Sequence, residues 1–456
     1  MHDFMQKMFV FLFVLCFAVA ARAQDLAASL RHCTSSVRSI APDDSDYSDL
    51  NGLRAAIGGA RIVLLGEQTH GEGSTFGAKI RLIKFLHEKM GFDVLAFESG
   101  FYDCARIWEN VEQGGALSQE VIGSLFYMYA TSVQMQPLFD YVQSEWHGGQ
   151  SGADGGQPGL HGQPGANGRQ GGLHGAQPLV LTGFESQHTG VKAKTQLFDD
   201  FERFMRKQQP AALDEEWDLF RRVSIATFAS RDYRPSLVER SRFFAKLTAL
   251  QRLLNEDGKV TDSLTSSMGF WYQVLNSIES QTTRYWQMVT GNEVSVRDLQ
   301  MAKNLIWLAE KAYPGKKIIV WAHNGHVAKG MSSLVTGSQP PPKGEDAFVP
   351  MGATIHHYFG SRAYCIGFSG SEGSYMNYVN DQIVNVAARP AGSIEGTLAG
   401  AGYTYAFVDY RRATGPLRQL QQATLADYGE ARGIWPEVFD GLFFIAKVSP
   451  VERTGK

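Results

Sequence analysis

Glu67 and His70 stand three residues apart in the segment RIVLLGEQTHGEGSTFG, which begins with a short apolar run. Three later apolar runs are also followed by ionisable side chains, namely Glu98, Glu185, and the pair His323 and His326. A histidine next to a carboxylate can take a proton from water, and the resulting hydroxide can attack an electrophilic carbon. The carboxylate selects the ring tautomer and stabilises the imidazolium. These residue types predict hydrolytic chemistry.

The four apolar runs are expected to be buried strands, at Arg61–Leu65, Asp93–Ser99, Pro178–Ser186 and Lys316–His326. Helical patterns separate them, and this alternation is typical of a parallel sheet covered by helices on both faces. In open α/β sheets, ligands bind outside the carboxyl ends of the strands. We therefore predict an α/β fold with a mainly parallel central sheet, in which the ionisable groups meet at one edge.

Three further segments have distinct patterns. Residues 192–288 contain amphipathic helical repeats without a strand-like run, which predicts a helical subdomain inserted between the third and fourth strands. Residues 147–177 consist mostly of Gly, Gln, Pro and His, a composition that predicts a flexible inserted loop. The helix after the first strand is expected to have Ser74 as its N-cap and to end at Gly91.

The N-terminal 23 residues resemble a signal peptide. A short polar start precedes an apolar run, and Ala21-Arg22-Ala23 has the small residues of a cleavage site. We therefore predict that residues 24–456 form the mature α/β domain. The predicted location is secreted or periplasmic, without stable membrane insertion after cleavage. A formal charge of −3 over 456 residues offers no long-range attraction for nucleic acid.

Cysteines and known motifs narrow the chemistry further. Cys33, Cys104 and Cys365 would remain in the mature chain, and one pair could form a disulfide in an oxidising compartment. Buried or half-buried side chains are a more frequent role for such scattered cysteines than nucleophiles. The chain has no G-x-S-x-G nucleophile motif, no H-E-x-x-H zinc motif and no P-loop. The sequence therefore favours activated water over a serine nucleophile.

At these residues the chain resembles the erythromycin esterase family. The resemblance rests on LLGEQTHGEGSTFGAKIRLIKFLHEKMGFDVLAFESG, RDLQMAKNLIWL and IIVWAHNGHVAKG. It implies hydrolysis of an ester or macrolide lactone by water, with His70 as the general base and Glu67 as its acid. It also implies that several other residues lie near the site: Lys79, Glu98, Arg297, Asp298, His323 and His326. Lys79 stands where macrolide-active members carry Arg, which exchanges a bidentate donor for a point charge.

We therefore predict an exported hydrolase of a carboxylic ester or lactone that needs no cofactor and no metal. The predicted catalytic residues are His70, Glu67, Glu98 and His323, and the predicted substrate contacts are Lys79, His326, Arg297 and Glu185. Two alternatives remain open at this point. One is a metal-dependent hydrolase that holds zinc or manganese through Glu67, His70, Glu98 and His323. The other is a periplasmic protein that binds haem or another small ligand through the same histidines.

Overall fold

The computed structural model describes residues 24–151, 177–254, 260, 263–287, 293–336 and 348–454. Its strands are β1 Thr34–Val37, β2 Ile62–Leu65, β3 Phe92–Gly100, β4 Val180–Glu185, β5 Lys317–Trp321, β6 Val335–Thr336, β7 Ala363–Met376, β8 Ile383–Val386, β9 Tyr405–Asp409, β10 Gln421–Thr424, β11 Glu430–Gly433 and β12 Gly441–Val448. In this part of the chain, nine strands form the central sheet, and β10, β11 and β6 form a small second sheet.

The central sheet is mainly parallel, as the alternation of apolar runs and helices predicts. Its strand order is β1-β9-β12-β7-β2-β5-β3-β4, with β8 paired to β7. The pairs from β12 through β7, β2, β5 and β3 to β4 are all parallel, whereas the pairs β1–β9, β9–β12 and β7–β8 are antiparallel. Strands β2, β5, β3 and β4 are therefore parallel neighbours, and their carboxyl ends lie along one edge.

Alternate residues of the central strands enter two separate hydrophobic cores, one on each face. In β2, Ile62 and Leu64 belong to the larger core, and Val63 and Leu65 belong to the smaller one. This alternation is the two-residue period of a strand. Helix α3 (Gly73–Met90) packs into the smaller core, and α13 (Glu293–Trp307) and α15 (Met351–Phe359) pack into the larger one. Helices therefore cover both faces, as predicted.

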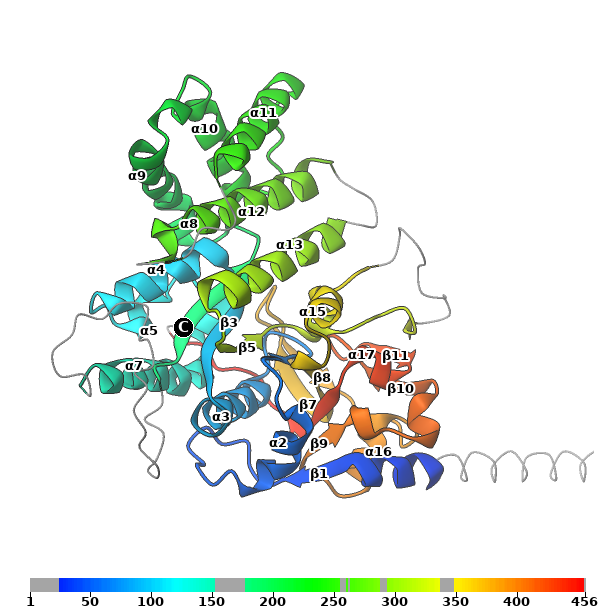
Figure 1. Ribbon diagram of the computed structural model, residues 1–456. Coiled ribbons are helices and arrows are strands. Elements are labelled where there is room, and N and C mark those ends of the chain that lie inside the picture. The colour runs from blue at the N-terminus through cyan, green and yellow to red at the C-terminus, as the bar shows by residue number, and fades with distance from the viewer. Residues whose placement is uncertain are drawn as a thin grey trace, which may run out of the picture.

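Every secondary-structure element that the structure describes between β4 and β5 is a helix. Its helices are α8 Val191–Thr195, α9 Leu197–Gln208, α10 Trp217–Ala229, α11 Leu237–Leu253, α12 Met268–Gln287 and α13. In Figure 1, α9 to α12 form the green group at the top of the molecule, and α13 runs between this group and the strands. The remaining helices are α2 Asn51–Ile57, α4 Phe101–Glu112, α5 Leu117–Glu120, α6 Tyr127–Thr131, α7 Gln136–Ser151, α14 Asn324–Val327, α16 Ile394–Gly400 and α17 Trp435–Val438.

Helix α3 ends as predicted but starts differently. Gly91 has a left-handed φ of 71° and caps the C-terminus, a conformation that favours glycine. The predicted N-cap Ser74 is wrong, because the helix starts at Gly73 with Glu72 in the cap position. The Ser74 hydroxyl instead accepts a hydrogen bond from the backbone N–H of Ser449 at 3.0 Å, so it fastens the helix start to the C-terminal segment.

Several predictions concern segments at the margins of the described structure. The predicted signal peptide, residues 1–23, lies outside the described residues, as do residues 152–176 of the predicted Gly-rich insert. Among the described residues, none of the helices has the length and apolar character that a membrane span needs. Cys33, Cys104 and Cys365 are buried free thiols, so no disulfide joins any two of these three described cysteines.

Candidate active site

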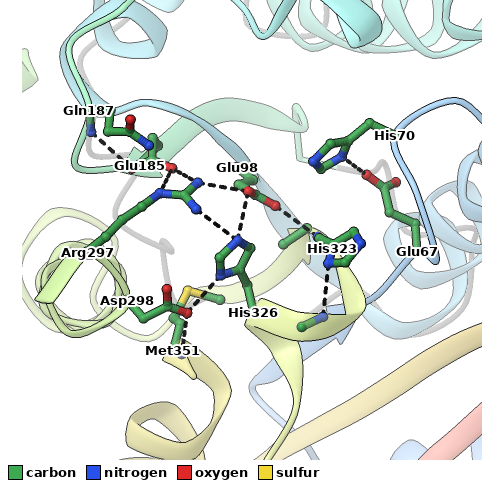
Figure 2. A network of polar contacts seen from close by, with 12 residues as sticks. Glu67, His70, Glu98, Glu185, Gln187, Arg297, Asp298, His323, His326 and Met351 are labelled. Atoms are coloured by element: carbon green, nitrogen blue, oxygen red, sulfur yellow. Dashed lines mark hydrogen bonds and ion pairs between the residues drawn. The ribbon is translucent and has the colours of Figure 1, made fainter. Parts of the chain in front are cut away.

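The predicted ionisable residues from four strands do come together at one edge of the central sheet. Glu67 and His70 follow β2, Glu98 lies near the end of β3, Glu185 ends β4, and His323 follows β5. Figure 2 shows them as two adjoining groups, with Glu67 and His70 on one side and Glu98 among charged partners on the other. The parallel register of the four strands is the reason for this convergence.

Glu67 is fully buried, and both of its carboxylate oxygens accept hydrogen bonds. Oε1 accepts from His70 Nδ1 at 2.6 Å and from the Tyr129 hydroxyl at 2.7 Å. Oε2 accepts from Lys79 Nζ and from Trp321 Nε1, each at 3.0 Å. Burial alone would raise the pKa of Glu67, but the Lys79 ammonium and then His70 outweigh it and hold this pKa below its usual value. Glu67 is therefore a buried carboxylate anion.

Lys79 lies in the interior of the protein, although it was predicted to contact the substrate. Its side chain is 0% exposed, Nζ is bonded to Glu67, and the ammonium lies 4.1 Å from the centroid of the Trp321 ring. Burial lowers the pKa of Lys79 to about 8, against the opposing effect of Glu67. A side chain without exposed surface cannot touch a substrate in this structure, so the prediction is corrected. Lys79 holds Glu67 in place and balances its charge.

The geometry of His70 leaves one ring nitrogen free to accept a proton. Nδ1 donates to the Glu67 carboxylate, so Nε2 is the nitrogen that can accept a proton. Among the described residues, Nε2 has no hydrogen-bond partner, and the side chain is 12% exposed. The rings of Phe126 and Tyr378 lie 4.9 Å and 5.0 Å from the imidazole, centroid to centroid. His70 therefore presents a basic nitrogen within a largely aromatic surrounding.

A second group of charges is centred on Arg297, from α13. Its Nε donates to Glu185 Oε2 at 2.8 Å and its Nη2 to Glu98 Oε1 at 2.9 Å, and Nη2 also contacts Glu185. His326 Nε2 lies 2.9 Å from Arg297 Nη1 and 3.3 Å from Glu98 Oε1, and its Nδ1 donates to Asp298 Oδ1 at 2.8 Å. One guanidinium thus joins the ends of β3 and β4 to the short helix α14 after β5 (Figure 2).

Charges within this second group set its protonation. Burial opposes ionisation of Glu98, but His326, His70 and Arg297 lower its pKa well below the usual range. Burial also opposes the charged form of His326, yet Glu98 and Asp298 raise its pKa above the ordinary value. The ionised Glu98 favours positive charge in this group, and Arg297 supplies it. Arg297 Nη1 can donate to His326 Nε2 only while that ring nitrogen is unprotonated, and Arg297 accordingly opposes the rise in the pKa of His326. The side chains of Arg297 and His326 are 14% and 13% exposed.

His323 lies between the two groups, and both of its ring nitrogens are already hydrogen-bonded. Nε2 donates to the Gln68 carbonyl at 2.7 Å, and Nδ1 accepts from the Gly325 N–H at 3.1 Å. The backbone N–H of His323 donates to Glu98 Oε2 at 2.9 Å. Burial, together with His70 and His326, lowers the pKa of His323 to about 4. Its predicted direct role in catalysis is therefore corrected to a positioning role, because both ring nitrogens are bonded to the backbone.

Two amide side chains that the sequence did not single out as functional hold the loops around this edge. Gln68 Nε2 donates to the Thr424 carbonyl at 3.0 Å, and Asn324 Nδ2 donates to the Phe368 and Leu425 carbonyls at 2.8 and 2.9 Å. Gly66 permits this packing, since a Cβ there would lie 2.1 Å from Asn324 Oδ1. The loop that carries Glu67 and His70 is thereby fixed to the neighbouring strand ends.

Sequence reasoning also missed the aromatic partners of the base. Tyr129 contributes a hydroxyl 2.7 Å from Glu67 and 3.1 Å from His70 Nδ1, and Trp321 supplies an indole N–H. Tyr129 lies in the short helix α6, where no spacing pattern relates it to Glu67. Trp321 lies within the predicted strand Lys316–His326, directly before the AHNGH residues, and this position was the one available signal.

The predicted metal ligands are already engaged with protein groups. Glu67 accepts four hydrogen bonds, and His323 uses both ring nitrogens. Across the described part of the chain, no group of three or more His, Cys, Asp or Glu side chains is arranged to hold a metal ion. A metal ion bound by Glu67, His70, Glu98 and His323 would therefore require several of these hydrogen bonds to break.

The fold and the site together define an α/β protein with a His–Glu pair at the strand ends, and comparison with known proteins identifies its family. The family model for erythromycin esterase matches residues 87–448. The chain therefore belongs to the erythromycin esterase family, a family of hydrolases.

Two relatives match nearly the whole chain. YbfO of Bacillus subtilis (strain 168), described as a suspected hydrolase, is 25% identical over 434 residues, which are 89% of this chain and 88% of the relative. Erythromycin esterase type II of Escherichia coli is 22% identical over 438 residues, which are 90% of this chain and 95% of that protein. At these identities the relatives support the hydrolase class and leave the substrate open.

Solved structures share the fold. A Bacillus cereus protein gives a TM-score of 0.70 at 21% identity, covering 95% of this chain and 99% of its own. A mutant erythromycin esterase in its open conformation gives 0.64 at 16% identity, covering 91% of this chain and 98% of its own. These matches agree with the α/β architecture predicted from the sequence.

Proposed function

We propose that this protein hydrolyses a carboxylic ester or lactone with a water molecule that His70 activates. The observation that carries the proposal is the 2.6 Å contact between His70 Nδ1 and Glu67 Oε1. It leaves Nε2 as an acceptor at a partly exposed position, which is where a general base needs its lone pair. Membership of the erythromycin esterase family supports hydrolysis, and ester or lactone specificity is the further step proposed here.

In this proposal, His70 Nε2 removes a proton from water while the oxygen attacks the carbonyl carbon. The imidazolium that forms is stabilised by Glu67, as a carboxylate does in other His-dependent hydrolases. The tetrahedral oxyanion then collapses, the C–O bond breaks, and the Nε2 proton passes to the leaving alkoxide. Arg297 is the partly exposed cation on the other side of His323, and it is suited, with His326 beside it, to stabilise the oxyanion.

The test is hydrolysis of a panel of carboxylic esters and lactones, erythromycin included, followed by mass spectrometry for the addition of one water. We expect turnover by the natural protein and none above background by His70→Ala. His357→Ala, at an exposed histidine of α15, is the matched control and should keep full rate. Turnover by His70→Ala at the natural rate would refute the role of His70. Loss of rate on adding a chelator would favour the metal-dependent alternative.

We also propose that the protein is exported, and that the mature chain begins at Gln24. Support comes from the apolar run and the Ala21-Arg22-Ala23 site in the sequence. N-terminal sequencing of the protein recovered from the periplasm or the medium tests this proposal directly. Recovery of the intact N-terminus from the cytoplasm alone would refute it.

A further inference from the structure

Two arginines that the proposed mechanism does not use share one tyrosine ring. The guanidinium carbon of Arg231, just after α10, lies 5.8 Å from the Tyr285 ring centroid, and that of Arg284, near the end of α12, lies 6.0 Å from it. A cation gains little free energy from an aromatic face near the surface. The two guanidinium groups repel each other, and this repulsion, after burial and Arg297, contributes to the lowered pKa of Arg284.

No carboxylate in the described part of the chain pairs with either arginine. Arg284 Nη1 is buried without a hydrogen-bond partner, an arrangement that costs free energy unless a ligand or water fills it. The two acids of the Arg297 group are bonded to other donors. Glu185 accepts from Arg297 Nε and from the Gln187 N–H, and Glu98 accepts from Arg297 Nη2 and the His323 N–H. Glu185 favours the charged form of Arg284 from a distance, but neither arginine has a carboxylate within ion-pair distance in the described structure.

The same pair is connected to the candidate active site. The Tyr285 hydroxyl donates to Gln187 Oε1 at 2.8 Å, and the Gln187 N–H donates to Glu185 Oε1 at 3.0 Å. The charge of Arg231 also reaches Tyr378, because it opposes the burial and the acidic neighbours that raise the pKa of Tyr378. The Tyr378 ring lies 5.0 Å from the ring of His70. Arg231 thus lies within electrostatic range of the residues around the base.

We propose that Arg231 and Arg284 bind an anionic group of the substrate, so that the ester or lactone cleaved here carries a carboxylate or a similar oxyanion. This inference rests on the proposed ester hydrolysis. An oxyanion bound by these two arginines would offset their repulsion and offer an acceptor to Arg284 Nη1. Hydrogen bonds between charged partners are the strong ones, so substrate charge becomes a determinant of specificity.

Three matched 4-nitrophenyl esters test the proposal: the adipate monoester, its neutral methyl ester, and the cationic 6-(trimethylammonio)hexanoate. We expect kcat/KM to be highest for the anionic ester and its advantage to shrink with added salt. Arg231→Gln and Arg284→Gln should each lower kcat/KM for the anionic ester by about tenfold or more, mainly through KM, and leave the neutral ester unchanged. The control is Arg203→Gln, at a side chain 75% exposed on α9 that pairs with Asp200.

Binding of free adipate, measured by calorimetry, separates the two proposals because it needs no turnover. Adipate binding by the natural protein and its loss in Arg284→Gln would support the anion site even if no ester is cleaved, and absence of cleavage would then count against the proposed hydrolysis alone. Equal kcat/KM for the anionic and neutral esters, with no effect of either arginine substitution, would overturn the anion site while ester hydrolysis stands. Failure of the natural protein to bind adipate would also overturn it.

Discussion

Replacing Glu67 by glutamine should affect stability and catalysis through separable causes. The amide has the size of the carboxylate but no charge. Its NH2 group is a hydrogen-bond donor, and it would face the donors that now bond to the carboxylate oxygens. Lys79 would then be a buried cation without its partner, 3.0 Å from a neutral amide. Breaking a buried ion pair by removing one member costs about 3–5 kcal/mol, and we expect Glu67→Gln to lose stability in that range.

Catalysis should fall by a different route, because a neutral amide does not stabilise the imidazolium of His70. General-base catalysis contributes about 10²–10⁴-fold, and we expect a loss of that order in kcat. The double variant Glu67→Gln/Lys79→Met removes both charges of the buried pair. It should recover most of the lost stability without recovering kcat, because the partner of His70 is still neutral.

Urea unfolding and ester hydrolysis, measured on the same preparations, distinguish these outcomes. Glu430→Gln is the control, since this acid is 60% exposed and lies 4.0 Å from Arg389. Recovery of kcat in the double variant would refute the view that Glu67 acts electrostatically on His70. A single Glu67→Gln variant as stable as the natural protein would refute the buried ion pair as described.

Three further predictions concern neighbouring groups. Tyr129→Phe removes a hydroxyl that contacts the carboxylate and the base, and should lower kcat about tenfold with a stability loss of about 1 kcal/mol, measured by kinetics and thermal unfolding. Burial raises the pKa of the Glu72 carboxyl from 4.5 to about 8, so the folded protein keeps this proton at pH values where the unfolded chain loses it. The free energy of unfolding should therefore fall as pH rises from about 5 to 8, by up to about 1.4 kcal/mol per pH unit. In Glu72→Gln, urea midpoints taken across that range should no longer show this loss. Arg297→Lys cannot reach Glu98 and Glu185 together, so turnover should fall at least tenfold, whereas an unchanged rate would contradict the bridging role.

The convergence of the strand ends was predictable because apolar runs and helical spacing are local properties of the sequence. Glu67 and His70 are three residues apart, and the apolar run before them identifies the strand that positions them. The parallel order then follows from the connecting helices. What these patterns predict is which ends of the strands carry the chemistry.

The partners of those residues could not be predicted, because they arise from contacts between distant parts of the chain. Tyr129 reaches Glu67 across 62 residues, and Trp321 does so across 254. Whether Lys79 faces a substrate or an internal carboxylate depends on how far α3 is covered by the rest of the fold. The side-chain direction of His323 depends likewise on the Gln68 carbonyl, which no sequence pattern reveals.

The neutral ring of His323 separates His70 from the charged group around Arg297, so that His323 itself places no further positive charge directly beside the His70 ring. The His323 ring centroid is 5.4 Å from that of His70 and 6.2 Å from that of His326. A protonated ring there would add a cation beside His70 and weaken its ability to accept a proton. The hydrogen bonds to the Gln68 carbonyl and from the Gly325 N–H require the neutral tautomer, and a pKa of about 4 keeps it neutral at physiological pH. The His323 ring is therefore an uncharged spacer, and its backbone N–H meanwhile holds Glu98 in the second group.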